Sequence, residues 1–289
     1  MIDINGNYVG IGIYMTQDKD GYIVIVTPIE GSAAEEKGLK SGDIILKVDG
    51  EECTGMDLTL VSNKIKGKEG TTVKLEILRE NEIITEVIQR RMVVINYVRS
   101  KVIEKDIGYI EILSFDGKSS NDFKEHLEEL QSKKIKSLII DIRDNGGGVV
   151  SQVIEIAEIL VPKGSMIMTT FDKEGNEENI FSKKEQMVEM EIVLLINGHS
   201  ASASEILAGA LKDNKVATLV GTTTFGKGIM QEVVKLEKGG AMKITIQEFK
   251  TPNGDAIHKT GIEPDYVVEQ EKDEKVDLQL QKAIELLKK

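Results

Sequence analysis

Apolar and polar positions alternate in short runs along the first third of the chain, a pattern typical of strands with one buried face. Turn signals separate these runs, and Asp18-Lys-Asp-Gly21 has the composition of a hairpin turn. Two other stretches have helical spacing, and each begins at a residue that can cap a helix, Ser32 or Asp57. The expected strands are 8–15, 22–27, 44–48, 73–79 and 83–88, and the expected helices are 32–37 and 57–65. We therefore predict that residues 1–95 form a β-rich domain with two helices.

The pattern changes at residue 107, where short, fully apolar runs begin to alternate with amphipathic stretches. Strands that alternate with helices form a largely parallel sheet whose strands are buried on both faces. The expected strands are 107–113, 138–142, 166–171, 192–196 and 216–220, and the expected helices are 121–131, 149–160 and 202–212. A polar, hairpin-like excursion over 172–186, an antiparallel hairpin of 229–236 and 242–249 that turns at Lys238-Gly-Gly240, and a C-terminal helix from Asp273 complete the series. Residues 96–289 are therefore predicted to form an α/β domain.

Composition argues against a nucleic-acid-binding protein, a membrane-spanning protein and a zinc protein. With 289 residues and 40% hydrophobic content the chain can bury real cores, and its net charge of −12 argues against non-specific binding to nucleic acid. It contains no apolar tract long enough to span a bilayer. A single cysteine, Cys53, rules out an internal disulfide and is expected to fill apolar space. The three histidines lack the spacing of a zinc site, so neither a metal nor another cofactor is expected.

The strongest chemical signal follows the apolar run 192–196. The loop after that strand should emerge at the carboxyl edge of the sheet, where α/β proteins place their sites. Ser202 then begins a helix, where unpaired backbone N–H groups stabilise developing negative charge. Its neighbours Ala201 and Ala203 leave room for a substrate backbone, and the N–H of Ala203 is a candidate for half of an oxyanion hole. Ser202 is therefore a candidate nucleophile.

A Gly-flanked lysine that we expect on the next strand supplies a candidate base. Lys227 lies between Gly226 and Gly228, which leave its backbone free to direct the side chain into a cleft. To accept a proton its amine must be neutral, which desolvation or a nearby positive dipole favours. Gln231 is four positions further on, so we expect it on the same face of a strand, with its amide oxygen orienting the amine. Together with Ser202 these residues predict a Ser-Lys hydrolase site.

The second half of the oxyanion hole is expected from Asn145-Gly-Gly-Gly148. This stretch also leaves the carboxyl end of an apolar strand, and its glycines expose backbone N–H groups. Gly147 and Gly148 are the candidate donors. The alternative is that the three glycines only connect a strand to a helix.

Two competing chemistries fit the same residues. The segment Gly221-Thr-Thr-Thr-Phe-Gly-Lys227 matches the start of a phosphate-binding loop, but Gly228 replaces the Ser or Thr that binds magnesium, and a strand follows where a helix is needed. A Ser-His-Asp triad through His199 or His258 stays open, because the chain order of triads varies. The favoured alternative gives His199 a part in loop packing and His258 a structural or surface position.

The first domain contains Gly31-Ser-Ala-Ala-Glu-Glu-Lys-Gly-Leu-Lys-Ser-Gly-Asp-Ile-Ile-Leu-Lys-Val-Asp-Gly50, which resembles the central signature of a PDZ domain. The resemblance covers roughly residues 8–92. It agrees with the local chemistry, because a strand entry with small residues can present backbone N–H groups to a terminal carboxylate. The residues expected to do so are Gly10, Ile11, Gly12 and Ile13.

Residues 97–270 resemble the catalytic domain of the carboxyl-terminal processing (tail-specific) proteases, serine peptidases that carry a PDZ domain. The matching motifs are Asp141-Ile-Arg-Asp-Asn-Gly-Gly-Gly148, Ser200-Ala-Ser-Ala-Ser-Glu-Ile206, the segment 221–231 and the segment 251–265. The resemblance implies a peptidase core of the crotonase and ClpP type, with Ser202 as nucleophile, Lys227 as general base and Gln231 as its support. Asp213 matches a position that is usually acidic in the family, where we expect structural support.

The same resemblance implies a partner class. The PDZ domain would recognise the free, apolar C-terminus of a protein substrate and control its access to the site. It further implies a homodimer, and a membrane tether only through a segment absent from this chain. The N-terminus shows no signal peptide, and we expect the full-length protein to be extracytoplasmic, membrane-associated or secreted. The alternative function is a catalytically silent, PDZ-containing regulator that binds peptides.

Overall fold

The computed structural model describes residues 8–235, 240–271 and 276–288, and the chain divides into two units, residues 1–95 and 96–289. In the first unit the main sheet has the order β2-β3-β4-β6-β7, with β5 paired to β4, and β1 pairs separately with β8. Its strands are β1 (Tyr8–Gly10), β2 (Ile13–Gln17), β3 (Ile23–Pro28), β4 (Ile44–Val48), β5 (Glu51–Glu52), β6 (Thr72–Arg79), β7 (Glu82–Gln89) and β8 (Arg91–Val93), and its helices are α1 (Ala33–Glu36) and α2 (Leu58–Ile65).

The strand expected over 8–15 is wrong in one respect, because the structure breaks it into β1 and β2. Gly12 has a φ of +81°, and a Cβ at this position would lie 2.3 Å from the Cβ of Ser32. The Ser32 hydroxyl donates to the carbonyl of Gly12 at 3.0 Å and accepts from the N–H of Glu35 at 3.2 Å, so it caps α1 as predicted. The loop between β1 and β2 is thereby fixed to the start of α1.

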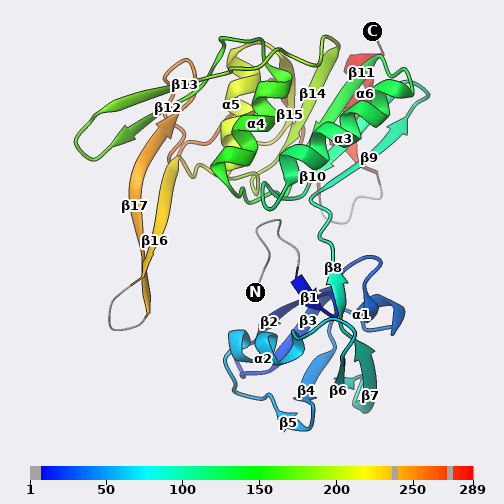
Figure 1. The fold of residues 1–289 in the computed structure, drawn as a ribbon. Coiled ribbons are helices and arrows are strands. Elements are labelled where there is room, and N and C mark those ends of the chain that lie inside the picture. The colour runs from blue at the N-terminus through cyan, green and yellow to red at the C-terminus, as the bar shows by residue number, and fades with distance from the viewer. Residues whose placement is uncertain (1–7, 236–239, 272–275, 289) are drawn as a thin grey trace. The chain divides into compact units, whose positions relative to one another are not determined.

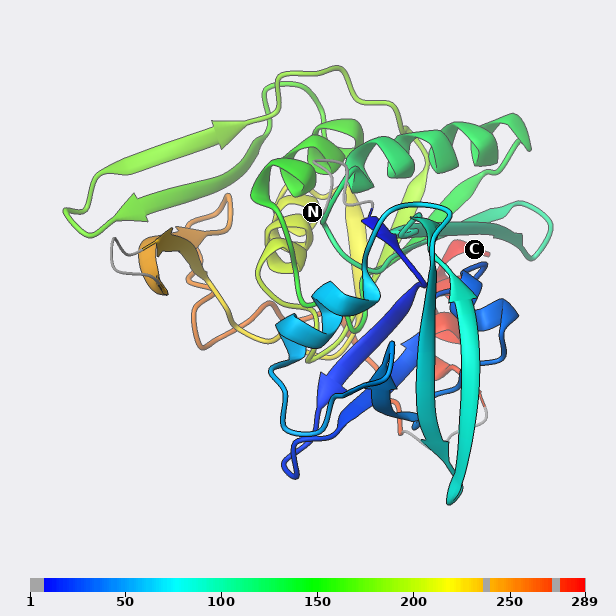
Figure 2. The same cartoon turned by 60° about the horizontal axis from the view of Figure 1, so that its bottom comes forward.

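The predicted cap at Asp57 is also confirmed, since its carboxylate accepts from the N–H of Thr59 at 2.8 Å. Helix α2 contacts β2, which is the edge strand of its sheet (Figures 1 and 2). The buried face of α2 packs Val61 and Ile65 into the core of this unit. Cys53 lies in the same core and is fully buried, as expected of an apolar filler; burial raises the pKa of its thiol.

The second unit is built on a six-stranded sheet of order β18-β15-β14-β11-β10-β9, in which only the β10–β9 pairing is antiparallel. This confirms the predicted α/β class with a largely parallel sheet. The strands are β9 (Val98–Ile103), β10 (Ile107–Ile112), β11 (Ser137–Asp141), β14 (Glu191–Ile196), β15 (Ala217–Gly221) and β18 (Tyr266–Val267). The helices are α3 (Ser119–Ser132), α4 (Val150–Leu160), α5 (Ala203–Asp213) and α6 (Leu278–Leu287).

Helices cover both faces of this sheet. Leu138 and Ile140 of β11 pack against α3, α4 and α5, whereas Ile139 between them packs against α6 (Figure 1). This two-sided burial explains why the three central positions of the strand, 138–140, are all apolar. No helix in the described ranges is both long and apolar enough to cross a membrane.

A second, antiparallel sheet of order β13-β12-β17-β16 extends from this unit (Figure 1). Its strands are β12 (Met166–Asp172), β13 (Glu177–Phe181), β16 (Ile229–Lys235) and β17 (Ala241–Lys250), so both expected hairpins are present. The turn expected at Lys238-Gly-Gly240 and the helix start expected at Asp273 fall on residues outside the described ranges. Helix α6 begins only at Leu278, after Val276, because Asp277 is its cap and accepts from the N–H of Leu280 at 2.9 Å.

Candidate active site

Three loops meet at the carboxyl edge of the parallel sheet: 142–148 after β11, 197–202 after β14 and 222–228 after β15. Asn145, which is fully buried, connects two of them. Its side-chain amide donates to the carbonyl of Ile112 at 2.7 Å, and its backbone carbonyl accepts from the N–H of Ala201 at 3.0 Å and from the Ser204 hydroxyl at 2.8 Å. The loop after β14 is therefore held at two points on the loop after β11.

Ser202 sits on a strained turn at the start of α5, the place the sequence predicts for it. Its φ is +58° and its ψ is −111°, a conformation that costs a non-glycine residue about 1–3 kcal/mol. Such strained strand-to-helix turns lift a side-chain oxygen away from the backbone around it. The side chain of Ser202 is half-buried, between the buried residues Ala201 and Ala203.

Glu205, which is fully buried, ties this turn to the lysine loop. One carboxylate oxygen, Oε2, accepts from the N–H of Ser202 at 2.9 Å and from the N–H of Lys227 at 2.8 Å. The two backbone nitrogens thus cannot be further apart than the sum of these distances. The other oxygen, Oε1, accepts from the Thr224 hydroxyl and from the N–H of Gly226, both at 2.6 Å. A carboxylate with four donors is a rigid, charge-assisted junction between the two loops.

Sequence reasoning did not assign Glu205 a function. A signal for it existed, because a glutamate three residues after a helix-capping serine is the pattern of a capping box. Half of that box is formed by the bond from the Ser202 N–H. The pattern alone does not contain the other three donors, Thr224, Gly226 and Lys227, which lie further along the chain.

Lys227 lies in the loop before β16, so placing it on a strand is wrong. Its side chain is half-buried, and within the described residues no hydrogen bond or ion pair engages its amine, with Ser202 or with any other group. Gln231 is exposed and lies on β16, where a register shift between Met230 and Gln231 interrupts the alternation of side chains. The argument for a shared face therefore loses its premise, an unbroken strand through both positions, and a contact between Lys227 and Gln231 stays a prediction.

The glycine loop packs directly on the serine turn. Gly147 has a φ of +107°, and a Cβ there would lie 2.8 Å from the Ala201 carbonyl oxygen and 2.9 Å from the Ser202 Cβ. Its own N–H donates to the Asn145 side chain at 2.9 Å, which removes it as an oxyanion donor. In the described structure the N–H groups of Ala203 and Gly148 have no acceptor. Gly147 therefore lets the two loops pack closely, because it has no side chain, while Ala203 and Gly148 supply N–H donors without a described acceptor.

The remaining candidates are placed as follows. His199 is exposed on the loop before Ser202, and only its backbone N–H is bonded, to the Asn197 side chain at 3.0 Å. His258 lies next to Gly228, where an added Cβ would meet the His258 backbone N at 2.5 Å. Its ring Nδ1 is buried without a hydrogen-bond partner. Asp213, at the end of α5, accepts from the N–H of Asn253 at 2.8 Å, which agrees with a structural part.

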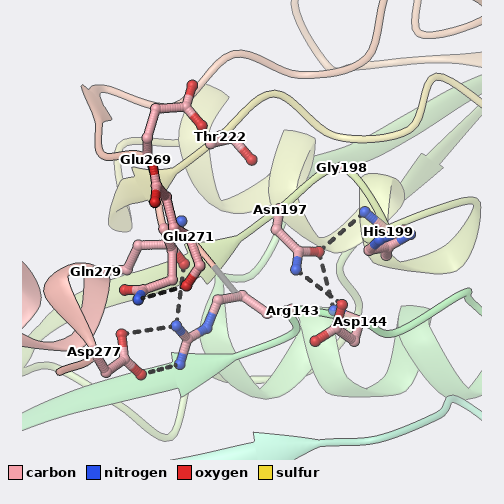
Figure 3. A pocket seen from close by; sticks show the side chains of 11 residues that line it. Arg143, Asp144, Asn197, Gly198, His199, Thr222, Glu269, Glu271, Asp277 and Gln279 are labelled. Atoms are coloured by element: carbon pink, nitrogen blue, oxygen red, sulfur yellow. Dashed lines mark hydrogen bonds and ion pairs between the residues drawn. The ribbon is translucent and has the colours of Figure 1, made fainter. Parts of the chain in front are cut away.

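A pocket of about 650 Å³ opens on the same sheet edge (Figure 3). Arg143 crosses it and forms paired hydrogen bonds with Asp277, at 2.9 and 2.8 Å, as well as with Asp141 behind it. Burial opposes the charge of Arg143, but these two carboxylates outweigh it and raise the pKa of the guanidinium. On the other side, Asn197 and Asp144 exchange two hydrogen bonds of 3.0 Å. The pair of Arg143 and Asp277 thus anchors the start of α6 beside the site. Ser202 does not line this pocket.

In the first unit the segment from Gly10 to Ile13 contains two backbone N–H groups without an acceptor among the described residues. The carbonyls of Ile11 and Gly12 accept from Ala34 and Ile29, whereas their N–H groups have no acceptor in the described structure. A pocket of about 360 Å³ lies alongside, lined by Val9, Asn63, Lys66 and Gly67. The amine of Lys66 lies 5.0 Å from the centre of the Tyr8 ring. The first unit therefore has two N–H groups without a described acceptor, those of Ile11 and Gly12, and the cation of Lys66 at the C-terminal end of α2.

Residues 106–268 match the model of peptidase family S41, and residues 24–79 match that of the PDZ domain. The chain belongs to peptidase family S41. It is 37% identical over 90% of its length to the carboxy-terminal processing protease CtpA of Bacillus subtilis, and spans 56% of that protein. It is also 33% identical over 99% of its length to the carboxyl-terminal-processing protease of Synechocystis sp., and spans 70% of it.

Among solved structures, the S41 chain is similar to the photosystem II D1 C-terminal processing protease. The two share 30% sequence identity with a TM-score of 0.57, and the match covers 97% of this chain and 77% of that one. The chain thus spans only part of several relatives it matches. Both the PDZ assignment and the peptidase-core assignment made from the sequence are confirmed by these matches.

Proposed function

We propose that this chain is a serine endopeptidase that cleaves proteins recognised by their C-terminal tails, with Ser202 as nucleophile and Lys227 as general base. The observation that carries the proposal is the single oxygen of Glu205 that binds the backbones of both residues. It binds the backbone of a serine on a strained turn and the backbone of a lysine whose amine has no partner among the described residues, which supports a shared site for the two side chains. Membership of a peptidase family supports the same reaction class.

In the proposed reaction the Ser202 oxygen attacks the scissile carbonyl carbon while the neutral Lys227 amine takes the hydroxyl proton. The carbonyl oxygen becomes negative and is stabilised by the unused N–H groups of Ala203 and Gly148. When the tetrahedral intermediate collapses, the C–N bond breaks and the lysine ammonium gives its proton to the leaving amine. Water, deprotonated by the same amine, then hydrolyses the acyl-serine ester. Gln231 is proposed to orient the amine.

For the lysine to act, its amine must come within hydrogen-bond reach of the serine oxygen, about 2.6–3.2 Å. The backbone nitrogens of both residues bind one carboxylate oxygen, and the movement proposed to close the remaining distance is rotation about the four side-chain torsions of Lys227. In the first unit, the N–H groups of Ile11 and Gly12 are proposed to bind the terminal carboxylate of the substrate, with the tail added along the edge strand β2.

The test is digestion of an unfolded casein by the full chain, with products identified by mass spectrometry. We expect cleavage by the wild type and none by Ser202→Ala or Lys227→Ala, whose thermal unfolding should match that of the wild type. We also expect a peptide substrate with a free C-terminus to be cut faster than its C-terminally amidated copy. Full activity of either variant would refute the mechanism. Binding of tails without cleavage of any protein would instead favour the silent regulator.

A further inference from the structure

Phe225 is the most exposed aromatic side chain in the described residues, at 63% of its full accessible area. It belongs to a chain with few aromatic residues, and it is absent from the hydrophobic cores. Removing the surface of a phenyl ring from water is favourable. The fold leaves most of that stabilisation unused at Phe225.

The backbone beneath this ring is rigid. The N–H of Phe225 donates to the Ser200 carbonyl at 3.0 Å, and both flanking residues, Thr224 and Gly226, donate to the buried Glu205 carboxylate at 2.6 Å. None of these bonds involves the Phe225 side chain. The turn would form with other side chains at this position, so the turn itself does not explain the aromatic ring.

The position of the ring relates it to the reaction. Through its bond to Ser200, Phe225 lies beside the segment that leads to Ser202, and it precedes Lys227 by two residues. The two loops run side by side, since a Cβ added to Gly198 would lie 3.8 Å from the Thr223 carbonyl oxygen. The turn that carries Phe225 therefore borders the Ser202 segment, where the scissile bond of a substrate would lie under the proposed function.

We propose that Phe225 is a substrate-contact residue that selects a large apolar side chain next to the scissile bond. The proposal rests on the proposed peptidase function and adds a preference at the cleavage point itself, apart from recognition of the tail. A rigid aromatic ring makes such a contact at low entropic cost, because its backbone is already fixed.

The experiment uses the full chain and two quenched fluorescent peptides built on the best-cleaved casein sequence, one with apolar residues flanking the scissile bond and one with alanines. For the wild type we expect kcat/KM to be about 10- to 100-fold higher on the apolar peptide. Phe225→Ala should reduce this ratio to below about threefold, mainly by slowing the apolar peptide. The matched control is Phe181→Ala, another exposed phenylalanine, on the outer strand β13, which should keep the wild-type ratio.

An unchanged ratio in Phe225→Ala would overturn the proposal, and so would an equal loss on both peptides, because the ring would then support the turn and not the substrate. If the alanine variant unfolds, Phe225→Leu and Phe225→Gln replace it: the leucine variant should keep the preference and the glutamine variant should lose it. Wild-type cleavage that does not depend on Ser202 would instead refute the peptidase mechanism. The two failures are thus distinguishable.

Discussion

Replacing Glu205 by glutamine tests the junction on which the site depends. The substitution keeps the size of the side chain but removes the charge that four donors share at 2.6–2.9 Å. The new amide nitrogen must face either the pair Ser202 and Lys227 or the pair Thr224 and Gly226. In both orientations at least one backbone N–H loses its acceptor and faces another donor beside a fully buried side chain.

The expected cost is large for one substitution. A hydrogen bond to a charged acceptor contributes about 1.5–3 kcal/mol, and a buried donor left without an acceptor costs about 1–3 kcal/mol. For a domain of this size 1 kcal/mol corresponds to a shift of about 2–4 °C in Tm, so the loss of one such bond, about 1.5–3 kcal/mol, should lower Tm of the second unit by roughly 3–12 °C. Because Glu205 binds the backbones of both proposed reacting residues, we also expect kcat to fall about a hundredfold at temperatures where the variant is folded.

Thermal unfolding followed by circular dichroism measures the first effect, and peptide hydrolysis at a temperature well below both transitions measures the second. Glu158→Gln is the matched control, since Glu158 is also buried and accepts from the N–H of Lys183 at 3.1 Å, but none of its hydrogen bonds involves a residue of the site. It should lower Tm less and leave kcat unchanged. A Glu205→Gln protein with wild-type Tm and wild-type kcat would refute this account of the site.

Two further substitutions have defined outcomes. Gly147→Ala should destabilise the fold by about 1–3 kcal/mol and abolish cleavage, because its Cβ meets the Ser202 turn at a positive φ. The control is Gly146→Ala, whose Cβ would have nothing within 4 Å, and it should change neither stability nor cleavage. An active Gly147→Ala would contradict the packing described. Burial opposes ionisation of Asp277, but the hydrogen bonds from Arg143 outweigh it and hold the pKa of that carboxyl below its usual 3.8. Its ionised form therefore adds stability above pH 3.8 that is lost as the pH falls through the lower, folded-state pKa. In urea unfolding at a series of pH values, Asp277→Asn should be less stable than the wild type near neutrality, and the gap should close in acid; a constant gap would refute the coupling.

Local rules predicted much of the fold from the sequence. Ser32 and Asp57 cap their helices because a short side-chain oxygen three or two residues before a free N–H can do so without help from the rest of the chain. The apolar strands of the parallel sheet were equally readable, since burial on both faces removes polar positions. By contrast, β9 was missed because it is an edge strand with polar residues such as Arg99 and Lys101 among apolar ones.

The failures share a physical cause, which is contact between segments far apart in the chain. The break at Gly12 exists because Ser32 packs against it, and the position of Lys227 is fixed by the distant Glu205. The same-face argument for Gln231 failed because a register shift against β17 changes which side chains share a face. The sequence was enough to predict which residue types form the candidate site, but not how those residues lie relative to one another.

The site combines a rigid serine with an adjustable lysine. The strain at Ser202, about 1–3 kcal/mol, is sustained by hydrogen bonds of Asn145 and Glu205, which fix the turn from two sides. The Lys227 backbone is fixed by the same carboxylate, while its amine has no described partner. Catalysis requires the serine oxygen and the oxyanion donors to be aligned before reaction, whereas the base needs only to reach the hydroxyl as the proton moves. If that division is correct, substitutions in the Asn145–Glu205 network should lower kcat without a change in KM, because they misalign the reacting groups and not the bound chain.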